Sequence, residues 1–138
     1  MSSAVQATLV DANVLLDVLT EDPAWVGWSS AALAAAADRG RLVISPIVYA
    51  EVSVRFSRIE DLEAALPPER IAREPVPWRA AFLAGKLFVE YRRRGGERRS
   101  PLPDFFIGAH AAVAGMRLLT RDATRYRSYL PGLALITP

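Results

Sequence analysis

The chain has 138 residues, 51% of them hydrophobic, which is the length of one domain with a sizeable core, so we expect a single domain over residues 1–138. It contains no cysteine, which excludes disulfides and thiolate metal sites and leaves oxygen ligands, or the single histidine His110, for any metal. The net charge is only +2, although arginine supplies nearly all of the basic side chains, and no apolar run is long enough to span a bilayer, so we expect a soluble cytoplasmic protein.

The first third of the chain predicts alternating strands and helices. Residues 8–10 form a short apolar run that predicts a buried strand, and the apolar stripe over 14–19 predicts a helix after it. Residues 22–40 predict a second helix, since Asp-Pro is typical of a helix start and glycine of a helix end. Residues 42–44 then predict a second strand, and the Ser-Pro pair at 45–46 starts a third helix in the same way.

The middle of the chain predicts a short polar helix over 59–66, a weak third strand over 71–74 and the longest helix from Pro77. In that longest helix, apolar residues recur at helical spacing, and we expect them to pack into the core. The residues of this stripe are Trp78, Ala81, Phe82, Gly85, Phe88 and Val89.

The last third contains one linker-like segment, YRRRGGERRSPLPD at residues 91–104, which we expect to be a loop between helices. A helix over 104–115, a strand over 117–120, a helix from Asp122 and a strand over 133–137 complete the prediction. Strands that alternate with helices throughout favour a parallel, doubly wound sheet with helices on both of its faces.

Three aspartates stand where a helix is predicted to start, and each has two interpretations. Asp11 follows the first strand, Asp122 follows the fourth, and Asp104 opens the helix before that strand. A short acidic side chain there can cap free N–H groups and complement the helix dipole, which would be a purely structural role. Ligand sites of open α/β sheets, however, lie at the carboxyl ends of strands, the place that Asp11 and Asp122 occupy.

Glu51 favours the ligand interpretation. It shares a helical stripe with Ile47, Ala50 and Val54, the face that we expect to pack inward, and a lone buried carboxylate is costly unless it is paired or metal-bound. The crossover to the fourth strand reverses direction, so the ends of the first and fourth strands should flank one crevice, over which Glu51 and Asp104 can lean. Four carboxylates in one place repel unless cations neutralise them, and hard oxygen donors select Mg²⁺ or Mn²⁺.

Four segments, VDANVLLD, SPIVYAEV, LPDFFIGAHA and LLTRD, resemble in order the four acidic motifs of PIN-domain ribonucleases, and the short chain is most similar to VapC-type toxins of toxin–antitoxin modules. The resemblance implies an α/β fold with three α/β/α layers and a central, mostly parallel sheet of four to five strands. It also implies a metal-dependent endoribonuclease acting on tRNA or another structured RNA, a homodimer, and a cognate VapB-type antitoxin. Trp25 and Trp28 are our candidates for such contacts, which require exposed apolar surface.

The resemblance further implies which side chains carry the chemistry. The catalytic ligands of Mg²⁺ or Mn²⁺ would be the four acids Asp11, Glu51, Asp104 and Asp122. Asp11 would be the central ligand, and Glu51 would hold a metal-bound water or orient the nucleophile. Asn13 and Thr120 would give polar support, whereas Ala12, where many relatives carry a hydroxyl residue, departs from the pattern and could not assist the metal.

Apart from the four acids, the chain has 17 basic and 11 acidic side chains. The resulting surface charge near +6 suits a phosphate backbone. Five arginines just before Asp104 would either guide RNA to the site or form a solvated helix end that complements the dipole. They are Arg92, Arg93, Arg94, Arg98 and Arg99. We expect His110 to be an ordinary helix residue and neither a ligand nor a base, since no serine or cysteine nucleophile accompanies it.

Two rival interpretations use the same fold. A phosphatase of the haloacid-dehalogenase type also ends its first strand in a nucleophilic aspartate, but it requires a second one where Asn13 stands and a lysine that Lys86 is badly placed to supply. A non-catalytic, doubly wound receiver or docking module is the other, although a receiver carries a lysine after its last strand and this sequence has none there. Mg²⁺-dependent cleavage of RNA distinguishes the nuclease from both.

Overall fold

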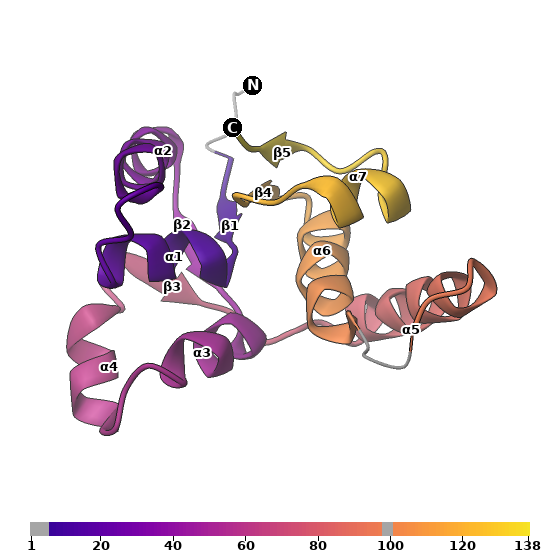
Figure 1. The fold of residues 1–138 in the computed structure, drawn as a ribbon, viewed down its shortest axis with the longest axis horizontal. Helices are drawn as coiled ribbons and strands as arrows, with labels where there is room; N and C mark the ends of the chain where they lie inside the picture. The colour runs from indigo at the N-terminus through magenta and orange to yellow at the C-terminus, as the bar shows by residue number, and fades with distance from the viewer. Residues whose placement is uncertain (1–5, 98–100) are drawn as a thin grey trace.

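The computed structural model describes residues 6–97 and 101–138, and its centre is a five-stranded, all-parallel sheet in the order β3-β2-β1-β4-β5 (Figure 1). The strands are β1 Thr8–Val10, β2 Leu42–Ile44, β3 Ile71–Arg73, β4 Arg117–Leu119 and β5 Leu135–Ile136. The expected α/β class, with a parallel sheet in a three-layer α/β/α arrangement, is thereby confirmed.

Seven helices lie in the described part of the chain and connect these strands. They are α1 Ala12–Leu19, α2 Val26–Arg39, α3 Pro46–Ser53, α4 Ile59–Ala65, α5 Trp78–Arg93, α6 Leu102–Ala114 and α7 Thr124–Tyr129. Figure 1 shows α5 extending outward from the sheet, and its main packing partner is α6. Within residues 6–97 and 101–138, no helix combines the length and the apolar character that a membrane crossing needs.

The strands at the centre of the sheet are buried along their whole length, as expected where helices cover both faces of a parallel sheet. Leu9 of β1 lies opposite Val43 of β2 and Leu118 of β4, and all three are fully buried. The chain runs from β2 and β3 on one side of β1 to β4 and β5 on the other. The carboxyl ends of β1 and β4 therefore flank the point where the strand order reverses, the usual ligand position of such sheets.

Local sequence signals predict most helix ends correctly. α3 begins after Ser45, whose Oγ accepts the N–H of Val48 at 3.3 Å, and α6 ends at Gly115, which adopts a left-handed φ of 68°. α2 begins later than predicted, at Val26, because the Asp22 carboxylate accepts two backbone N–H groups in a turn that precedes the helix.

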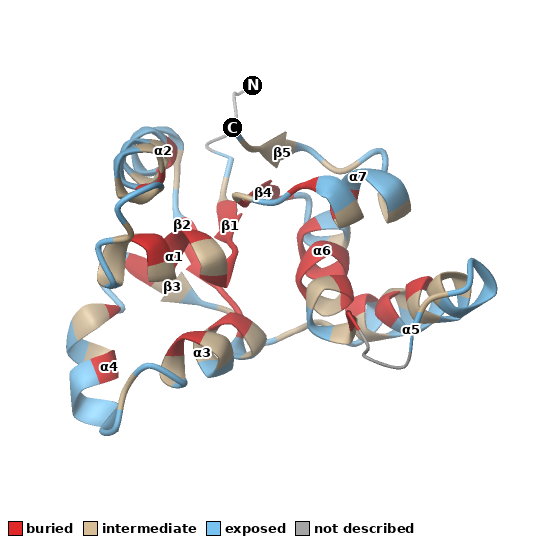
Figure 2. Ribbon diagram, viewed as in Figure 1, coloured by how far each residue is buried: buried red, intermediate tan, exposed pale blue. Residues whose placement is uncertain are grey.

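The predicted core stripe of α5 is wrong. Trp78 is 91% exposed, and the residues of α5 that pack against α6 are Ala80, Ala84 and Leu87. None of the six predicted residues is buried: Trp78, Phe82, Gly85 and Val89 are exposed, and Ala81 and Phe88 are half-buried. Figure 2 shows buried residues of α5 only in short stretches between exposed and half-buried ones. Small side chains let two helices approach closely, so α5 buries Ala80 and Ala84 and leaves Trp78 and Phe82 outside.

Candidate functional site

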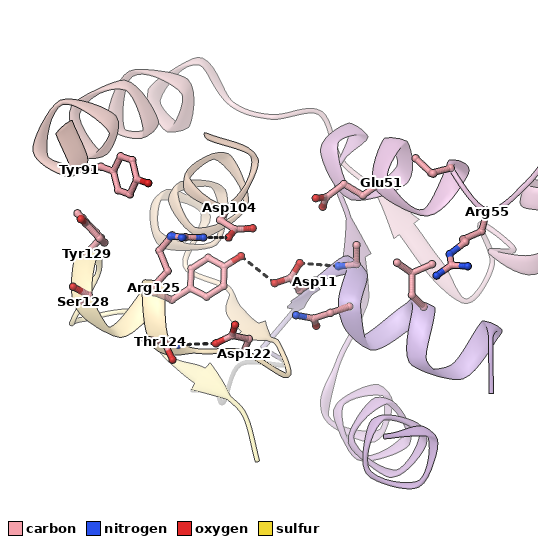
Figure 3. A pocket seen from close by; sticks show the side chains of 15 residues that line it. Asp11, Glu51, Arg55, Tyr91, Asp104, Asp122, Thr124, Arg125, Ser128 and Tyr129 are labelled. Atoms are coloured by element: carbon pink, nitrogen blue, oxygen red, sulfur yellow. Dashed lines mark hydrogen bonds and ion pairs between the residues drawn. The ribbon is translucent and has the colours of Figure 1, made fainter. Parts of the chain in front are cut away.

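The four predicted acids lie around one cavity of about 880 Å³, which we call the carboxylate cavity (Figure 3). They come from four places in the chain: Asp11 follows β1, Glu51 lies on α3, Asp104 lies in the first turn of α6, and Asp122 follows β4. The cavity therefore forms at the reversal of strand order, where the sequence predicted a shared crevice.

Asp11 is both a helix cap and a wall of the carboxylate cavity. Its Oδ1 accepts the N–H of Ala12 at 2.8 Å, and its Oδ2 accepts the hydroxyl groups of Thr120 at 2.9 Å and Tyr126 at 3.0 Å. Burial of this carboxyl raises its pKa to about 6, with repulsion by Asp104 adding to the rise and the two hydroxyl groups opposing it. The capping and ligand interpretations of Asp11 are thus compatible.

Glu51 reaches the cavity for a different reason from the predicted one. The stripe expected to pack inward includes Ala50, which is exposed, and Val54, which is 82% exposed. α3 instead buries Val48 and Val52, and Glu51 borders that buried face. Its Oε1 is buried with no hydrogen-bond partner among the described residues. Burial and the charges of two neighbouring aspartates raise the pKa of Glu51 to about 7.

Asp104 and Asp122 line the more open walls of the cavity. Among the described residues, the Asp104 carboxylate contacts Arg125, whose Nη1 donates to Oδ2 at 2.8 Å. Asp122 is exposed, and its Oδ1 accepts the N–H of Thr124 at 3.3 Å in the turn before α7, which begins at Thr124 and not at Asp122. The guanidinium group of Arg125 therefore holds the Asp104 carboxylate.

Asn13 and Thr120 link the helix after β1 to the turn after β4. The Asn13 side-chain amide donates from Nδ2 to Thr120 Oγ1 at 3.3 Å and accepts the N–H of Arg121 at 3.1 Å. Thr120 Oγ1 donates to Asp11 at 2.9 Å and accepts the N–H of Asp122 at 3.2 Å. One hydroxyl group thus contacts both of the acids that follow central strands.

Two residues of α7 that the sequence did not predict contact the acids. Tyr126, only 3% exposed, donates to Asp11, and Arg125 pairs with Asp104. Gly108 of α6 makes room for the tyrosine ring, since a methyl group at this position would come within 2.9 Å of it. The available signal was closeness in sequence, because both residues follow Asp122 within four positions, in the first turn of α7.

A buried ionic cluster lies beside the cavity, and we call its members Asp17, Ser29 and Arg121 the α1–α2 clamp. Asp17 is 3% exposed and accepts Arg121 Nε at 2.8 Å, Arg121 Nη2 at 3.0 Å and Ser29 Oγ at 2.7 Å. The Arg121 guanidinium also lies 5.1 Å from the centre of the Trp25 ring. Because Arg121 directly precedes Asp122, the clamp holds the turn that carries this acid.

The five predicted RNA-contacting arginines are only partly described. Arg98 and Arg99 lie outside the described residues. Arg92 and Arg93 are exposed in the last turn of α5, which extends into the segment expected to be a loop, and Arg94 is exposed at its end. Their positive charge complements the dipole at that helix end, and a role in guiding RNA stays a prediction.

His110, Trp25 and Trp28 do not line the carboxylate cavity. His110 is fully buried on α6 with its Nε2 3.8 Å from Glu74 Oε1, and burial lowers its pKa. Trp25 and Trp28 are half-buried and pack edge to face, with ring centres 6.3 Å apart, whereas Trp78 on α5 is far more exposed. The predicted role of the first two tryptophans in partner contacts stays a prediction.

The donor set of the cavity fits a hard divalent cation. All four acids offer oxygen ligands, Glu51 Oε1 is buried without a hydrogen-bond partner in the described chain, and a cation would relieve the repulsion between the acids. In residues 6–97 and 101–138, no three His, Asp or Glu side chains stand close enough, as placed, to hold one ion. The Asp104 carboxylate is turned toward Arg125 (Figure 3), and the Asp11 carboxylate accepts the hydroxyl group of Tyr126.

Comparisons with known proteins agree with this fold. The PIN-domain family model matches residues 8–128. Three solved structures are similar over nearly their whole chains. They are VapBC2 from Rickettsia felis bound to a DNA fragment from their promoter (20% identity, 96% of this chain and 98% of that chain, TM-score 0.74), VapBC-1 from nontypeable Haemophilus influenzae (19%, 95% and 97%, 0.71), and VapBC-5, a member of the VapBC family of toxin–antitoxin systems, from Mycobacterium tuberculosis (19%, 96% and 97%, 0.57). A comparison with curated protein sequences gave no match.

Proposed function

Since the chain belongs to the PIN-domain family, we propose that it is a metal-dependent nuclease and that the carboxylate cavity is its active site. The observation that carries this proposal is the convergence of Asp11, Glu51, Asp104 and Asp122 on one cavity at the reversal of strand order. Carboxylates gathered in this way repel one another, and a bound Mg²⁺ or Mn²⁺ ion would neutralise this repulsion.

The proposed reaction is hydrolysis of a phosphodiester bond. A cation held by these acids would supply water of lowered pKa and positive charge that stabilises the transition state. Asp11, oriented by two hydroxyl groups, would hold the cation together with Asp104 and Asp122. Glu51, whose Oε1 is buried without a hydrogen-bond partner among the described residues, would orient the attacking water and accept its proton. Attack by water needs no 2′-hydroxyl group, so the products should carry 5′-phosphate and 3′-hydroxyl ends.

The proposed substrate is RNA, such as tRNA or another structured RNA, and the proposed role is that of a VapC-type toxin. Support for this role comes from the similar solved structures, whose names are those of VapBC proteins. Support for a nucleic-acid substrate comes from the excess of basic side chains outside the four acids. A cognate VapB-type antitoxin, a homodimer and a cytoplasmic location complete the proposal.

The phosphatase alternative finds no support in the geometry. The ammonium group of Lys86 lies 5.0 Å from the centre of the Phe82 ring on α5, and Lys86 does not line the carboxylate cavity. Asn13, at the position where that family has its second aspartate, hydrogen-bonds to Thr120 and to the backbone of Arg121. A non-catalytic module of the same fold is distinguished by its inability to cleave RNA.

Cleavage of purified RNA in the presence and absence of metal tests the proposal. We expect cleavage with Mg²⁺ or Mn²⁺, none with EDTA, and recovery when the metal is restored. Asp11→Asn should abolish cleavage and remain folded, because asparagine caps a helix about as well as aspartate. Glu69→Gln, which removes a charge from an exposed side chain outside the cavity, is the matched control. Full activity in EDTA, or parental activity of Asp11→Asn, would contradict the proposal.

A further inference from the structure

The carboxylate cavity has a second end, lined by Tyr91, Ser128 and Tyr129, which we call the tyrosine end. Figure 3 shows Tyr91 on α5 and the other two residues at the end of α7, on the far side of Arg125 from Asp11. The chemistry proposed above uses none of these three side chains. They nevertheless line the same continuous cavity as the four acids.

The two tyrosine rings are held in place by the fold. Both pack against the ring of Phe105, which is 1% exposed, with ring centres 5.9 Å away for Tyr91 and 5.2 Å away for Tyr129. The backbone at Gly96 lies directly against the Tyr91 ring, and a methyl group at this glycine would overlap that ring. Both rings are half-buried, so each is anchored in the protein and still reaches the cavity.

Positive charge accompanies these rings. The Arg94 guanidinium lies 4.3 Å from the centre of the Tyr129 ring and donates to Ser128 Oγ at 2.9 Å, while Arg94 also pairs with Glu90 at 2.9 Å. Arg125 stands between the tyrosine end and the acids, where it pairs with Asp104. The cavity thus combines acids at one end with aromatic rings and guanidinium groups at the other.

Spacing along the chain places the tyrosine end next to the acids. Phe105, which supports both rings, directly follows Asp104. Tyr129 follows Arg125 by four positions on α7, so their side chains are neighbours, about 5–6 Å apart at their Cβ atoms. A strand whose phosphate lies at the carboxylates can therefore extend within the same cavity toward the tyrosine end.

We propose that the tyrosine end binds the unpaired base of the nucleotide beside the bond that is cut. The proposal rests on the proposed nuclease function and adds a substrate subsite to it. Preorganised aromatic rings next to cationic side chains are the groups on which single-stranded nucleic acids stack. Stacking of this kind tolerates any base, so the tyrosine end contributes affinity for an exposed nucleotide and not recognition of one sequence.

Substrates that lack single bases test the subsite on the unchanged protein. On a short RNA with a mapped cleavage site, we would replace one nucleotide at a time by an abasic one. An abasic nucleotide at one position beside the cut should raise KM about tenfold and leave kcat nearly unchanged. Tyr91→Leu and Tyr129→Leu should raise KM for the intact RNA by a similar factor, and the abasic change should then add nothing.

Matched variants separate stacking from packing. Tyr91→Phe and Tyr129→Phe keep the rings and should keep the parental KM, while Phe82→Leu removes an exposed ring outside the cavity and should change nothing. Thermal melting checks that each variant is folded. A KM that is the same for every abasic position, or parental KM values in both leucine variants, would overturn the subsite.

The two proposals fail in different ways. If the parent cleaves no RNA with Mg²⁺ or Mn²⁺, the nuclease proposal fails, and the subsite is then tested by binding alone. Fluorescence anisotropy of a labelled oligoadenylate should show affinity that falls about tenfold in Tyr91→Leu and is unchanged in Tyr91→Phe. Equal affinity of the parent and Tyr91→Leu, or no binding by the parent, would overturn the subsite as well.

Discussion

Glu51 is the residue whose proposed function requires a charge that its burial makes costly. Its Oε1 is buried without a hydrogen-bond partner among the described residues, and its pKa is raised to about 7 by burial and by two neighbouring acids. Glu51→Gln removes the charge and keeps the shape. We expect it to raise the free energy of unfolding without metal by about 1–2 kcal/mol at about pH 8, after discounting the shift for partial exposure. Melting in EDTA measures this, and a destabilised variant would contradict it.

The same prediction has a defined pH dependence. The folded-state pKa values of Glu51, about 7, and Asp11, about 6, exceed the ordinary values of 4.5 and 3.8. The folded state therefore binds more protons than the unfolded state between about pH 4 and pH 7, so stability without metal falls as pH rises through this window. The advantage of Glu51→Gln should shrink toward zero as the pH falls to about 4, and Glu69→Gln, at an exposed side chain outside the cavity, is the control.

The sequence predicted that the four acids would share a crevice but did not predict the side chains that contact them. Asp11 and Asp122 could be placed because strand ends are visible in the sequence and converge at a known point of the sheet. Glu51 was placed by an inward stripe that the structure does not have, so its position was right for a wrong reason. Tyr126 and Arg125 were missed because a contact between α7 and the acids depends on tertiary packing, which periodicity alone does not describe.

At the scale of elements, the α1–α2 clamp joins two helices to the turn after β4. Asp17 is 3% exposed and Arg121 is 30% exposed, so loss of the arginine leaves a charge that water cannot reach. We expect Arg121→Leu to destabilise the protein by about 3 kcal/mol, and Asp17→Asn in the same chain to restore much of this loss by removing the stranded charge. Denaturant unfolding of both variants checks this, and equal stability of the single and double variants would refute it.

Element types and order were predictable because most strands are apolar runs and most helices carry a recognisable start or stop. The failures have a common cause, which is competition between local pattern and tertiary contact. α2 starts late because Asp22 uses its carboxylate in a preceding turn. The predicted core stripe of α5 was wrong because helical spacing shows which residues share a face of the helix but not which face packs against α6. The face that packs there carries the alanines.

At the scale of the whole molecule, charge separates the acidic cavity from a basic exterior. Binding of RNA should weaken as salt concentration rises, because each phosphate contact releases counterions. Replacing Arg92, Arg93 and Arg94 by alanine should lower the slope of log affinity against log salt by about 0.7 for each single-strand phosphate contact that is lost. Binding titrations with a labelled RNA at several salt concentrations measure this slope.

The control for this prediction removes the same charge elsewhere. Arg39, Arg58 and Arg70 are exposed and come from α2 and from the segments before α4 and β3. Figure 1 shows α2 and α4 on the opposite side of the molecule from α5. Their triple alanine variant should keep the parental slope. If both triple variants lower the slope equally, the arginines at the end of α5 do not form a specific path for RNA.

The position of β1 at the centre of the sheet affects how the protein is made. β1 pairs with β4, and Thr8 and Arg117, which are in register across the pair, are 109 positions apart. Such a distant pairing is slow to form because the intervening chain must close a long loop first. While a ribosome still holds β4 and α7, the nascent chain has no neighbour for β1 on that side, and Asp11 lacks the hydroxyl groups of Thr120 and Tyr126. A growing chain therefore cannot assemble the cavity before β4 and α7 have emerged, which delays any cleavage of RNA until both elements have been synthesised.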